Sequence, residues 1–505
     1  MISKKQFGAV TFIVIVITAL LTWSINNFVV YGIGDEMTGK FRTIAGIIQR
    51  SSYYDIPEDI LQDGSIRGMV DSLDDPDSIY LTPDEAQAFE NSFLAEYMGV
   101  GIRTTKIISG FMVVDVAAKS PAAEAGVKQN DIIIKINNDD IQTSDNTISE
   151  LLKKNTLQEL TVLRDNKEVI IPIQKATVDF TTSISHIQEM NDKKILVFDL
   201  QEFTDKTADL FAADLKKMAD NDIDGVVIDL RNNTGGSVDV AKKILAMTVR
   251  GKDANNAEYN YLKLQNKEQA RIEKNAKEQS QAVPADAFET FVSNNKAFMI
   301  KQPTVILVNE KTASAAEMVA AGMNQIDGIA LIGNSTYGKG TVQEVIPVVS
   351  DGSAIKLTTK KWFTPTGENL TPEHPLIPTE NSVDSIPYTI STLGANKEYK
   401  NGDKDSITST TIADTQMILS YFGYNANRAD GLFDDATETQ IKKFQKDNDI
   451  KETGKIDSKT LWKINEQLIK YTQDVQNDVT MQKAFVQLEK KINTEKAENA
   501  TTDNN

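Results

Sequence analysis

The sequence has no cysteine and only two histidines, His186 and His374, among its 505 residues. Without cysteine the chain cannot form disulfide bonds, thiolate metal sites or a cysteine nucleophile, although this absence does not identify the cellular compartment. With so little histidine there are few ways to build a Ser-His-Asp triad, and the PEHP stretch around His374 is typical of a loop. A serine nucleophile in this chain is therefore expected to use a different base.

Basic residues are also in short supply. The 54 lysines and arginines are outnumbered by 72 aspartates and glutamates, which gives a formal net charge of −18. Such an acidic chain is a poor partner for nucleic acid. No motif calls for a cofactor or a metal ion, so neither is expected. The length and the hydrophobic content of 40% are enough for three or four domains with real cores.

Charged residues are missing from 6–34, and the apolar core of this run approaches the roughly 20 residues that cross a bilayer. Trp23 and Tyr31 suit the membrane interface, and two lysines precede the run on its short side. We therefore predict a single-pass transmembrane helix at 7–31 in the cell membrane, with residues 1–6 inside the cytoplasm and all later domains outside it. A cleaved signal peptide is the alternative, but no clear Ala-x-Ala site follows the run.

Residues 36–95 carry apolar side chains at helix-like intervals, for example Ile44, Ile47 and Ile48. This spacing predicts a helical N-terminal region. Its expected role is packing, because nothing in the spacing points to chemistry.

From 96 to 177 the pattern changes to short strands separated by turns. Three motifs resemble those of a PDZ domain: GVGI at 99–102, SPAAEAGV at 120–127 and NDIIIKIN at 130–137. In such a domain a glycine-flanked loop offers backbone N–H groups to the terminal carboxylate of a peptide, while a strand edge pairs with the peptide backbone. The residues in the matching loop are Gly99, Val100, Gly101 and Ile102. A purely structural β module is the alternative.

The region 178–386 is predicted to be an α/β core with a mixed sheet, because apolar strands at 194–199 and 225–230 flank a helical pattern. The chain as a whole is thus expected to be a multidomain α/β protein. A charged stretch at 251–300, with a predicted helix at 263–281, interrupts this core. We interpret it as an insertion that caps a site, and a solvated helix is the alternative.

The strongest candidates for chemistry lie within 304–347. A predicted strand at 304–309 and a polar turn lead to Ser314, which begins an alanine-rich helix containing Ala315 and Glu317. A serine at a helix start is a candidate nucleophile. Ser-Ala-Ala-Glu is also a capping box, in which the hydroxyl and Glu317 only satisfy backbone N–H groups, and this role is the alternative.

Two further pieces could meet that serine. Lys339 lies in a glycine turn, where a surface charge is the ordinary expectation, and Gln343 follows four residues later. On an extended strand these two side chains would share a face. Upstream, the RNNTGG loop at 231–236 has adjacent glycines that can approach a substrate closely, although an ordinary strand-to-helix turn is the alternative. The N–H groups of Gly236 and Ala315 are the expected oxyanion donors.

A lysine can replace histidine as a general base only in its neutral form. Lowering the pKa of a lysine from about 10.4 to near 7 costs roughly 4 to 5 kcal/mol, which desolvation can supply and a nearby carboxylate would oppose. Four apolar residues are expected to form a water-poor floor: Ile329, Leu331, Ile332 and Val342. We therefore predict that Lys339 is largely buried and that no acidic side chain pairs with it.

Three motifs together resemble those of the carboxyl-terminal processing peptidases, or tail-specific serine proteases: DLRNNTGG at 229–236, VNEKTASAAE at 308–317 and GKGTVQ at 338–343. The resemblance implies that Ser314 is the nucleophile, that Lys339 is the general base and that Gln343 orients Lys339. The separation, 339 − 314 = 25 residues, matches the family pattern, whereas Thr234 departs from the proline of many members. The resemblance also implies a core related to crotonase and Clp proteases, and it allows a homodimer formed through 36–95.

Residues 387–410 are polar and are predicted to be a linker. The helical pattern at 411–470 resembles the three-helix peptidoglycan-binding domain of cell-wall hydrolases, mainly in its turns DGLF at 430–433 and TGKID at 453–457. Without that resemblance the apolar spacing indicates only a small helical domain. Residues 471–505 are rich in charge and poor in apolar side chains, which predicts a mobile tail.

These features favour a membrane-anchored serine endopeptidase with a Ser/Lys dyad. It would cleave extracytoplasmic proteins whose C-termini are engaged by the PDZ domain, and it would be held near peptidoglycan. A noncatalytic, wall-associated PDZ scaffold is the main alternative. A crotonase-like hydratase or thioesterase and a cell-wall hydrolase are two others, but the sequence shows no acyl-nucleotide signature for the former and no metal site for the latter.

Overall fold

The computed structural model describes residues 35–93, 96–107, 110–117, 119–129, 131–137, 139–141, 148–152, 157–164, 167–179, 182–218, 221–249, 260–292, 300–348, 351–382, 398–402, 409–425, 427–473 and 475–502. The chain divides into two compact units, one formed by Met1–Asp84 with Val345–Leu357 and the other by Glu85–Glu344 with Thr358–Asn505. The predicted transmembrane helix at 7–31 falls outside the described residues. Among the helices that are described, none is both long enough and apolar enough to span a bilayer.

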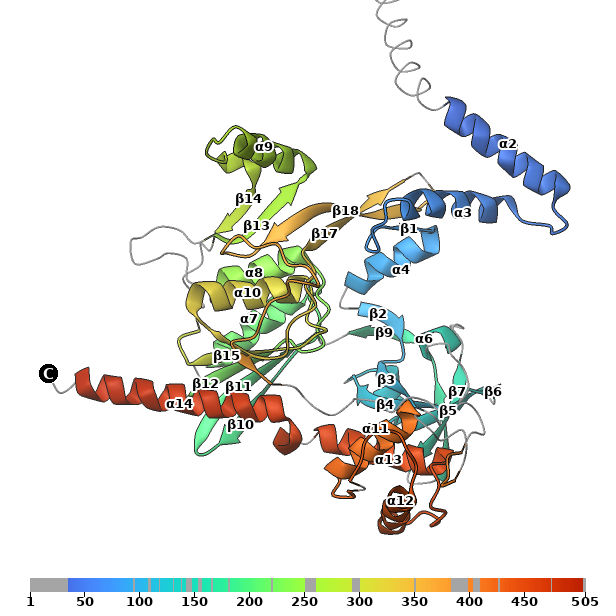
Figure 1. Ribbon diagram of the computed structural model, residues 1–505, viewed down its shortest axis with the longest axis vertical. Helices are drawn as coiled ribbons and strands as arrows, with labels where there is room; N and C mark the ends of the chain where they lie inside the picture. The colour runs from blue at the N-terminus through green and yellow to red at the C-terminus, as the bar shows by residue number, and fades with distance from the viewer. Residues whose placement is uncertain are drawn as a thin grey trace, which may run out of the picture. The chain divides into compact units, whose positions relative to one another are not determined.

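The first unit is mainly helical, with α2 (Asp35–Ser51) and α3 (Glu58–Asp71) joined to a short strand β1 (Ile79–Leu81) (Figure 1). The strand was not expected from the sequence. It pairs antiparallel with the first residues of β18 (Ala354–Phe363), and the Tyr80 hydroxyl donates to the Asp63 carboxylate of α3 at 3.0 Å. The helix α4 (Pro83–Phe93) follows in sequence and leads into the second unit.

The second unit begins with an antiparallel sheet in the order β3-β4-β5-β7-β8, with β6 paired to β5. Its elements are β3 (Ile102–Ile107), β4 (Gly110–Val116), α5 (Pro121–Ala125), β5 (Ile132–Ile136), β6 (Asp139–Asp140), α6 (Ile148–Leu151), β7 (Gln158–Arg164) and β8 (Lys167–Ile173). A separate two-stranded ribbon joins β2 (Glu96–Gly99) to β9 (Ala176–Asp179). The predicted short strands of this region are thus present, and β2 and β9 add a pair that the sequence pattern did not suggest.

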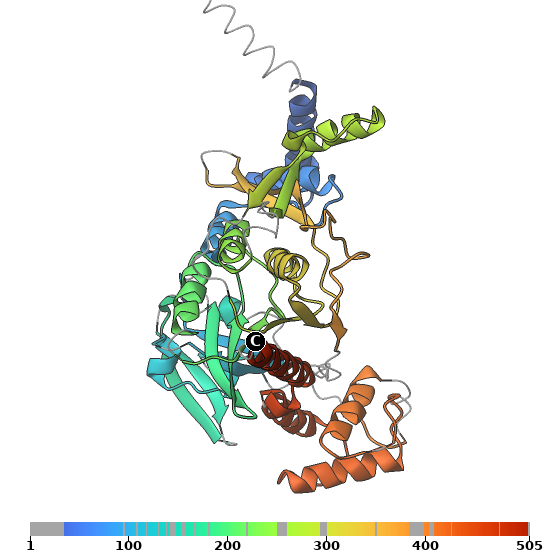
Figure 2. The same cartoon turned by 90° about the vertical axis from the view of Figure 1, so that its left-hand side faces the viewer.

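The central sheet has the order β10-β11-β12-β15-β16-β19, with neighbours parallel from β11 onward and β10 antiparallel at the edge. Its strands are β10 (Ser183–Met190), β11 (Lys193–Leu200), β12 (Gly225–Asp229), β15 (Thr304–Val308), β16 (Ala330–Gly333) and β19 (Glu380–Asn381). Strands buried on both faces are continuously apolar, which is why β12 and β15 were predictable. One face is covered by α7 (Thr207–Met218), α8 (Val238–Thr248) and α10 (Ala315–Asp327), as Figures 1 and 2 show.

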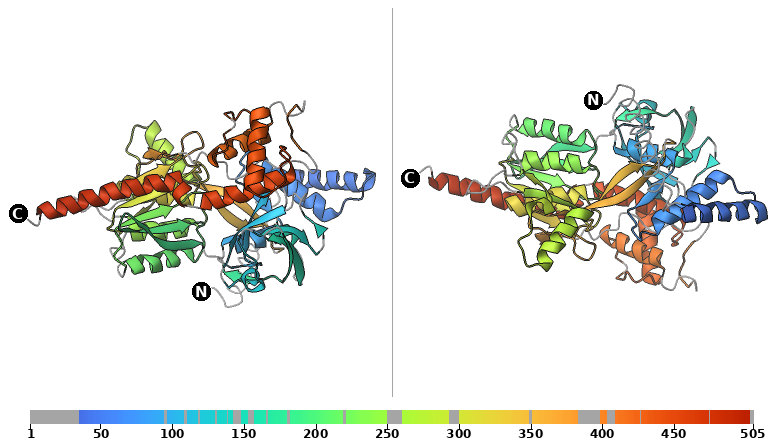
Figure 3. Two further views of the ribbon diagram at one scale, coloured as in Figure 1. Left: turned by 90° about the horizontal axis from the view of Figure 1, so that it is seen from below. Right: turned by 90° about the horizontal axis from the view of Figure 1, so that it is seen from above.

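The other face of this sheet is covered by α14 (Val479–Thr502), where the sequence had predicted a mobile tail at 471–505. That prediction is wrong for the described part of the segment. Figure 3 shows α14 lying across the strands. Five side chains form one buried stripe on the helix: Met481, Ala484, Phe485, Leu488 and Ile492. Each large apolar side chain that is buried contributes roughly 1.5–3 kcal/mol. The prediction relied on the low average apolar content of the segment and missed that its few apolar residues have helical spacing.

The insertion also differs from its prediction. The expected helix at 263–281 begins only at Lys267, because residues before it belong to the strand β13 (Asn260–Asn266). Asn266 caps α9 (Lys267–Glu278) in a reciprocal capping box with Gln269. β13 pairs with β18 and with β14 (Glu289–Val292), and η1 (Ala285–Ala287) precedes β14. Because Leu262 and Leu264 are buried in the main hydrophobic cluster, β13 is part of the core.

The C-terminal module contains three helices, α11 (Thr410–Tyr421), α12 (Asp435–Asp447) and α13 (Ser458–Gln473), around a hydrophobic cluster of its own. Most of the predicted linker lies outside the described residues. Within it, Tyr399 is buried and pairs with Ile456 of the module, so this point of the segment belongs to the folded module.

Candidate active site

Ser314 lies where the chain passes from β15 into α10. Its backbone angles, φ 55° and ψ −118°, are rare for a residue with a side chain and cost of order 1–3 kcal/mol. The turn is held by Thr312, whose hydroxyl donates to the Leu230 carbonyl at 2.8 Å, and by the Ala313 N–H, which donates to the Asn233 carbonyl at 3.0 Å. This framework fixes a strained, partly exposed serine at the N-terminus of a helix.

Glu317, one turn into α10, joins Ser314 to the lysine turn. The carboxylate is completely buried and accepts hydrogen bonds from the N–H of Ser314 at 2.8 Å, of Gly338 at 2.7 Å and of Lys339 at 2.8 Å. It also accepts from the Thr336 hydroxyl at 2.5 Å. Burial raises the pKa of Glu317, and these hydrogen bonds offset part of that rise. A capping box accounts for the contact with Ser314 alone, and no sequence pattern pointed to the other three.

The Lys339 turn is shaped by close contacts to its glycines. A Cβ at Gly338, where φ is 86°, would lie 2.1 Å from the Thr371 carbonyl oxygen, so no side chain fits there. The Trp362 indole N–H donates to the Lys339 carbonyl at 2.6 Å. Lys339 itself is partly exposed, which differs from the largely buried lysine that we predicted. The expectation that no acidic side chain pairs with its amine stays a prediction.

Gln343 is on β17 (Thr341–Pro347), and this strand begins two residues after Lys339. The argument that both side chains share the face of one extended strand therefore fails, because Lys339 belongs to the preceding turn. The amide of Gln343 donates to the hydroxyls of Thr341 and Thr358, each at 3.0 Å. These contacts fix its orientation on the sheet.

The predicted apolar floor is also divided. Successive residues of a strand face opposite sides of the sheet. Leu331 and Val342 belong to the cluster on the α10 side, with Ile329 packed against it, whereas Ile332 faces α14. Ile332 therefore cannot contribute to a floor beneath the lysine turn.

The glycine loop reaches Ser314 directly. A Cβ at Gly235 would lie 2.9 Å from the Cβ of Ser314 and 3.1 Å from the N atom of Ala315. The buried Asn233 shapes the loop, since its side-chain oxygen accepts from the Gly235 N–H at 2.8 Å and its amide donates to the Leu200 carbonyl at 2.6 Å. This loop is thus packed against the start of α10.

Gly236 continues the loop with φ 131°, and a Cβ there would lie 2.4 Å from the Phe203 carbonyl oxygen. Phe203 bonds to both neighbours of Gly236. Its N–H donates to the Gly235 carbonyl at 2.9 Å, and its carbonyl accepts from the Ser237 N–H at 2.8 Å. Within the part of the chain that the structure describes, no residue accepts a hydrogen bond from the N–H of Gly236 or of Ala315. The prediction that these two groups donate to an oxyanion stays a prediction.

Arg231, at the start of the same loop, was not singled out by the sequence. Its guanidinium donates to Asp229 and, from the opposite end of the chain, to Asp478. Burial lowers the pKa of Arg231, but the two carboxylates outweigh this effect and hold the pKa well above its ordinary value. In the sequence, the clue to this contact is Asp478, which directly precedes the apolar stripe of α14. The clue can be recognised once that segment is predicted to be a helix.

The PDZ loop residues serve the fold of their own domain. The Val100 side chain is buried in the domain core, and its carbonyl accepts from the Ala122 N–H at 2.8 Å. Gly101 has φ 79°, and a Cβ there would lie 2.1 Å from the Cβ of Ser120. Gly99 ends β2 and Ile102 begins β3, so the four residues form the connection between these strands.

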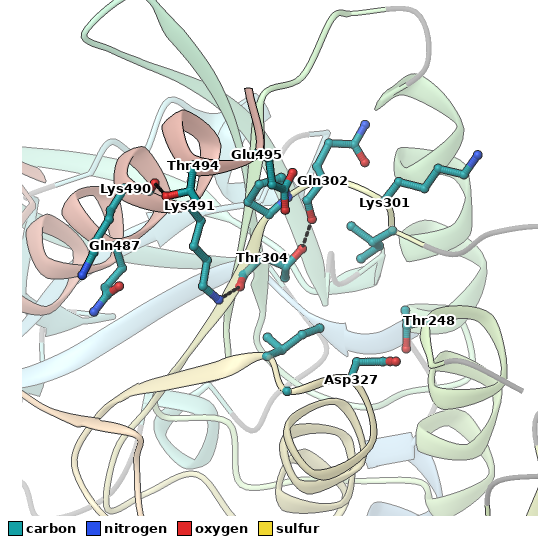
Figure 4. Close-up of a pocket in the computed structure, with 14 residues that line it drawn as sticks. Thr248, Lys301, Gln302, Thr304, Asp327, Gln487, Lys490, Lys491, Thr494 and Glu495 are labelled. Atoms are coloured by element: carbon teal, nitrogen blue, oxygen red, sulfur yellow. Dashed lines mark hydrogen bonds between the residues drawn. The ribbon is translucent and has the colours of Figure 1, made fainter. Parts of the chain in front are cut away.

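A cavity of about 790 Å³ lies far from Ser314 along the sheet. Figure 4 shows it between α14 and the beginning of β15, with Thr304, Asp327 and Lys491 at its wall. Ser314 follows the other end of β15, and both parallel neighbours of this strand, β12 and β16, run in the same direction. The cavity is therefore not the place where Ser314 and the glycine loop meet.

Three family models match the chain. The model for peptidase family S41 matches residues 194–381, that for a PDZ domain matches 97–174, and that for a peptidoglycan binding domain matches 408–464. Together with the fold, these matches define a multidomain serine peptidase with an α/β core, a PDZ domain and a C-terminal helical domain.

Two relatives and one solved structure illustrate what the chain is similar to. The carboxy-terminal processing protease CtpA of Bacillus subtilis (strain 168) is 30% identical over 501 residues, which cover 97% of this chain and 99% of the relative. CtpB of the same organism is 26% identical, covering 90% of this chain and 89% of its own length. The structure of a photosystem II D1 C-terminal processing protease aligns over 67% of this chain and 86% of its own, at 17% identity and a TM-score of 0.41.

The chain therefore belongs to the carboxy-terminal processing protease family, peptidase family S41. This membership confirms the resemblance noted in the sequence, including its PDZ and peptidoglycan-binding parts.

Proposed function

We propose that the chain is an endopeptidase in which Ser314 is the nucleophile, Lys339 is the general base and Gln343 helps to orient Lys339. The observation that carries this proposal is the single Glu317 carboxylate, which holds the backbone of both Ser314 and Lys339. The strained backbone of Ser314 adds support, because such strain is concentrated at functional sites.

In this mechanism the Ser314 hydroxyl attacks the scissile carbonyl carbon while its proton passes to the neutral amine of Lys339. The resulting tetrahedral oxyanion accepts hydrogen bonds from the N–H groups of Gly236 and Ala315. The Lys339 ammonium then protonates the leaving amine, the C–N bond breaks and an acyl-enzyme remains. Water, deprotonated by the same lysine, attacks the ester, releases the second product and restores the Ser314 hydroxyl.

The substrate is a protein or peptide whose free C-terminus is engaged at the PDZ loop of Gly99, Val100, Gly101 and Ile102. The PDZ match supports peptide binding, and a terminal carboxylate is the group that such loops recognise. Two peptides that differ only in a free or an amidated C-terminus test this step. The free peptide should be cleaved faster, and equal rates would remove the PDZ domain from substrate selection.

The location follows from the N-terminal sequence. The uncharged run at 6–34 supports an anchor at 7–31 with the catalytic domains on the extracytoplasmic side, where the C-terminal module can bind peptidoglycan. Protease accessibility in intact cells, compared with that in lysed cells, tests the orientation. Digestion of the catalytic domains only after lysis would contradict it.

The central experiment compares the full chain with Ser314→Ala on an unfolded protein substrate. We expect the variant to lose hydrolysis while its circular dichroism and melting temperature stay unchanged. A noncatalytic scaffold would show no hydrolysis in either protein. Hydrolysis that survives in the variant would mean that another residue is the nucleophile.

A further inference from the structure

The glycine loop beside Ser314 begins at an arginine that two distant parts of the chain hold together. The Arg231 Nε and Nη2 atoms donate to the Asp229 carboxylate at 2.7–3.1 Å. Its Nη1 and Nη2 atoms donate to the Asp478 carboxylate at 2.9 and 2.7 Å. The exposed fractions of the three side chains are 11%, 13% and 19%, so water screens these contacts only weakly. Asp229 ends β12 of the core, whereas Asp478 comes from the C-terminal segment.

Asp478 has its own support, independent of Arg231. It stands directly before α14, where its side-chain Oδ1 accepts from the Met481 N–H at 2.8 Å and its carbonyl accepts from the Gln482 N–H at 2.8 Å. The neighbouring Thr480 hydroxyl makes a buried hydrogen bond of 3.1 Å with Ser382. The apolar stripe of α14 fixes the whole helix on the sheet. These contacts therefore hold the Asp478 carboxylate in a fixed position beside Arg231.

Four residues after Arg231, at Gly235, the loop comes into contact with the nucleophile Ser314. Asn232 follows with φ 62°, and its N–H donates to the Asn309 side chain at 2.9 Å. Gly235 then packs against Ser314. Because so few bonds separate them, a shift of Arg231 would move the peptide groups of Gly235 and Gly236 relative to the nucleophile.

We propose that Asp478, directly before α14, is a positioning residue, which acts through Arg231 to hold the loop at 232–236 against Ser314. The inference rests on the proposed function, since it assigns a role in the turnover that Ser314 carries out. It places a determinant of the catalytic rate almost one hundred residues after the peptidase region at 194–381. In the sequence this residue also follows the peptidoglycan-binding module.

The test uses Asp478→Asn in the full chain. Asparagine caps a helix as well as aspartate does, so α14 keeps its N-terminus and only the charge opposite Arg231 is lost. Two control variants accompany it. Asp224→Asn removes the 3.0 Å ion pair with Lys496 on the same helix, and Asp224 directly precedes β12, at the end of the strand opposite the loop. Met481→Ala weakens the docking of α14 but leaves the Asp478 carboxylate in place.

We expect Asp478→Asn to lower kcat roughly ten-fold or more while KM changes by less than about two-fold, because loop displacement impairs the chemical step. Amide hydrogen exchange should accelerate at 232–236 and stay unchanged in β15. Asp224→Asn and Met481→Ala should keep kcat within about two-fold of the parent chain, although Met481→Ala lowers the melting temperature.

A normal kcat in folded Asp478→Asn, or an equal loss of kcat in Met481→Ala, would overturn the positioning role. If Asp478→Asn does not fold, Asp478→Ser takes its place, because serine also caps the helix. The Ser314→Ala comparison separates the two proposals. An inactive Ser314→Ala protein beside a fully active Asp478→Asn protein leaves the proposed function intact and ends this inference.

Discussion

Gly235 lies against Ser314 so closely that a methyl group on the glycine would come within 2.9 Å of the serine Cβ. It would also come within 2.9 Å of the Ala313 carbonyl oxygen, so neither the loop nor the turn before α10 can accept it without moving. Any side chain at this position would therefore separate the glycine loop from the nucleophile.

The first prediction is that Gly235→Ala lowers kcat roughly 100-fold, because a displacement of about 1 Å at a reacting centre can cost that much. Steady-state kinetics on an unfolded protein measures the effect. Gly367→Ala is a matched control, since Gly367 also has a positive φ of 93° but has no atom within 4 Å of its added Cβ. Equal losses in both variants would assign the effect to backbone strain and not to the contact with Ser314.

The second prediction concerns Glu317→Gln. All four partners of the carboxylate are donors, and a glutamine can accept on only one of its two terminal atoms. Two donors would then face an NH₂ group, at a cost of about 1–3 kcal/mol for each unsatisfied group. We expect kcat to fall roughly 100-fold as Ser314 and Lys339 lose their common support. Replacement of the exposed Glu310 by glutamine, in the turn between β15 and α10, is the control. An active Glu317→Gln protein would contradict the prediction.

The third prediction is a pH dependence of stability. Burial raises the pKa of Glu317 above its ordinary value of 4.5, so the folded chain binds this proton more tightly than the unfolded chain does. The associated stability is present below 4.5 and is lost as the pH rises through the folded-state value. The free energy of unfolding of the parent chain, minus that of Glu317→Gln, should therefore increase as the pH falls toward 4.5. Denaturant unfolding at several pH values measures it, and parallel curves would refute it.

The sequence predicted the core strands because these depend on local patterns, whereas the meeting of the three motifs was implied by the resemblance to a family. Continuous apolar runs marked β12 and β15, and adjacent glycines marked a backbone that must come close to something. The pattern could not say which partners Glu317 finds across the fold, since those lie about 20 residues away and are mostly backbone N–H groups.

The sequence predictions were wrong where one residue pattern is compatible with two different structures. The charged run before Gln281 read as one helix, although its first residues pair as β13. The segment after Gln473 read as a tail because charges separate the apolar residues that α14 lines up on one face. Ile332 and Leu331 were assigned to one floor, whereas adjacent strand residues must face opposite sides of the sheet.

The C-terminal module supplies the last prediction, through its buried Gln445. The amide oxygen accepts from the Gly454 N–H at 2.9 Å, and the amide nitrogen donates to the Thr453 and Thr460 hydroxyls and to the Lys455 carbonyl. One side chain thus closes the whole turn before α13. Leucine at this position would fill a similar volume but would leave the buried Gly454 N–H without its acceptor, whereas the Lys455 carbonyl would keep the Thr460 hydroxyl as a donor at 3.1 Å.

Gln445→Leu should therefore destabilise the module by roughly 1–3 kcal/mol, the cost of leaving one buried N–H group unsatisfied. We expect weaker cosedimentation with purified peptidoglycan, together with unchanged cleavage of a soluble peptide, because the module is proposed to bind the wall and not to take part in the chemistry. The partly exposed Gln440→Leu on the same helix controls for the added apolar surface. If Gln445→Leu binds peptidoglycan like the parent chain, the turn that Gln445 closes is not needed for wall binding.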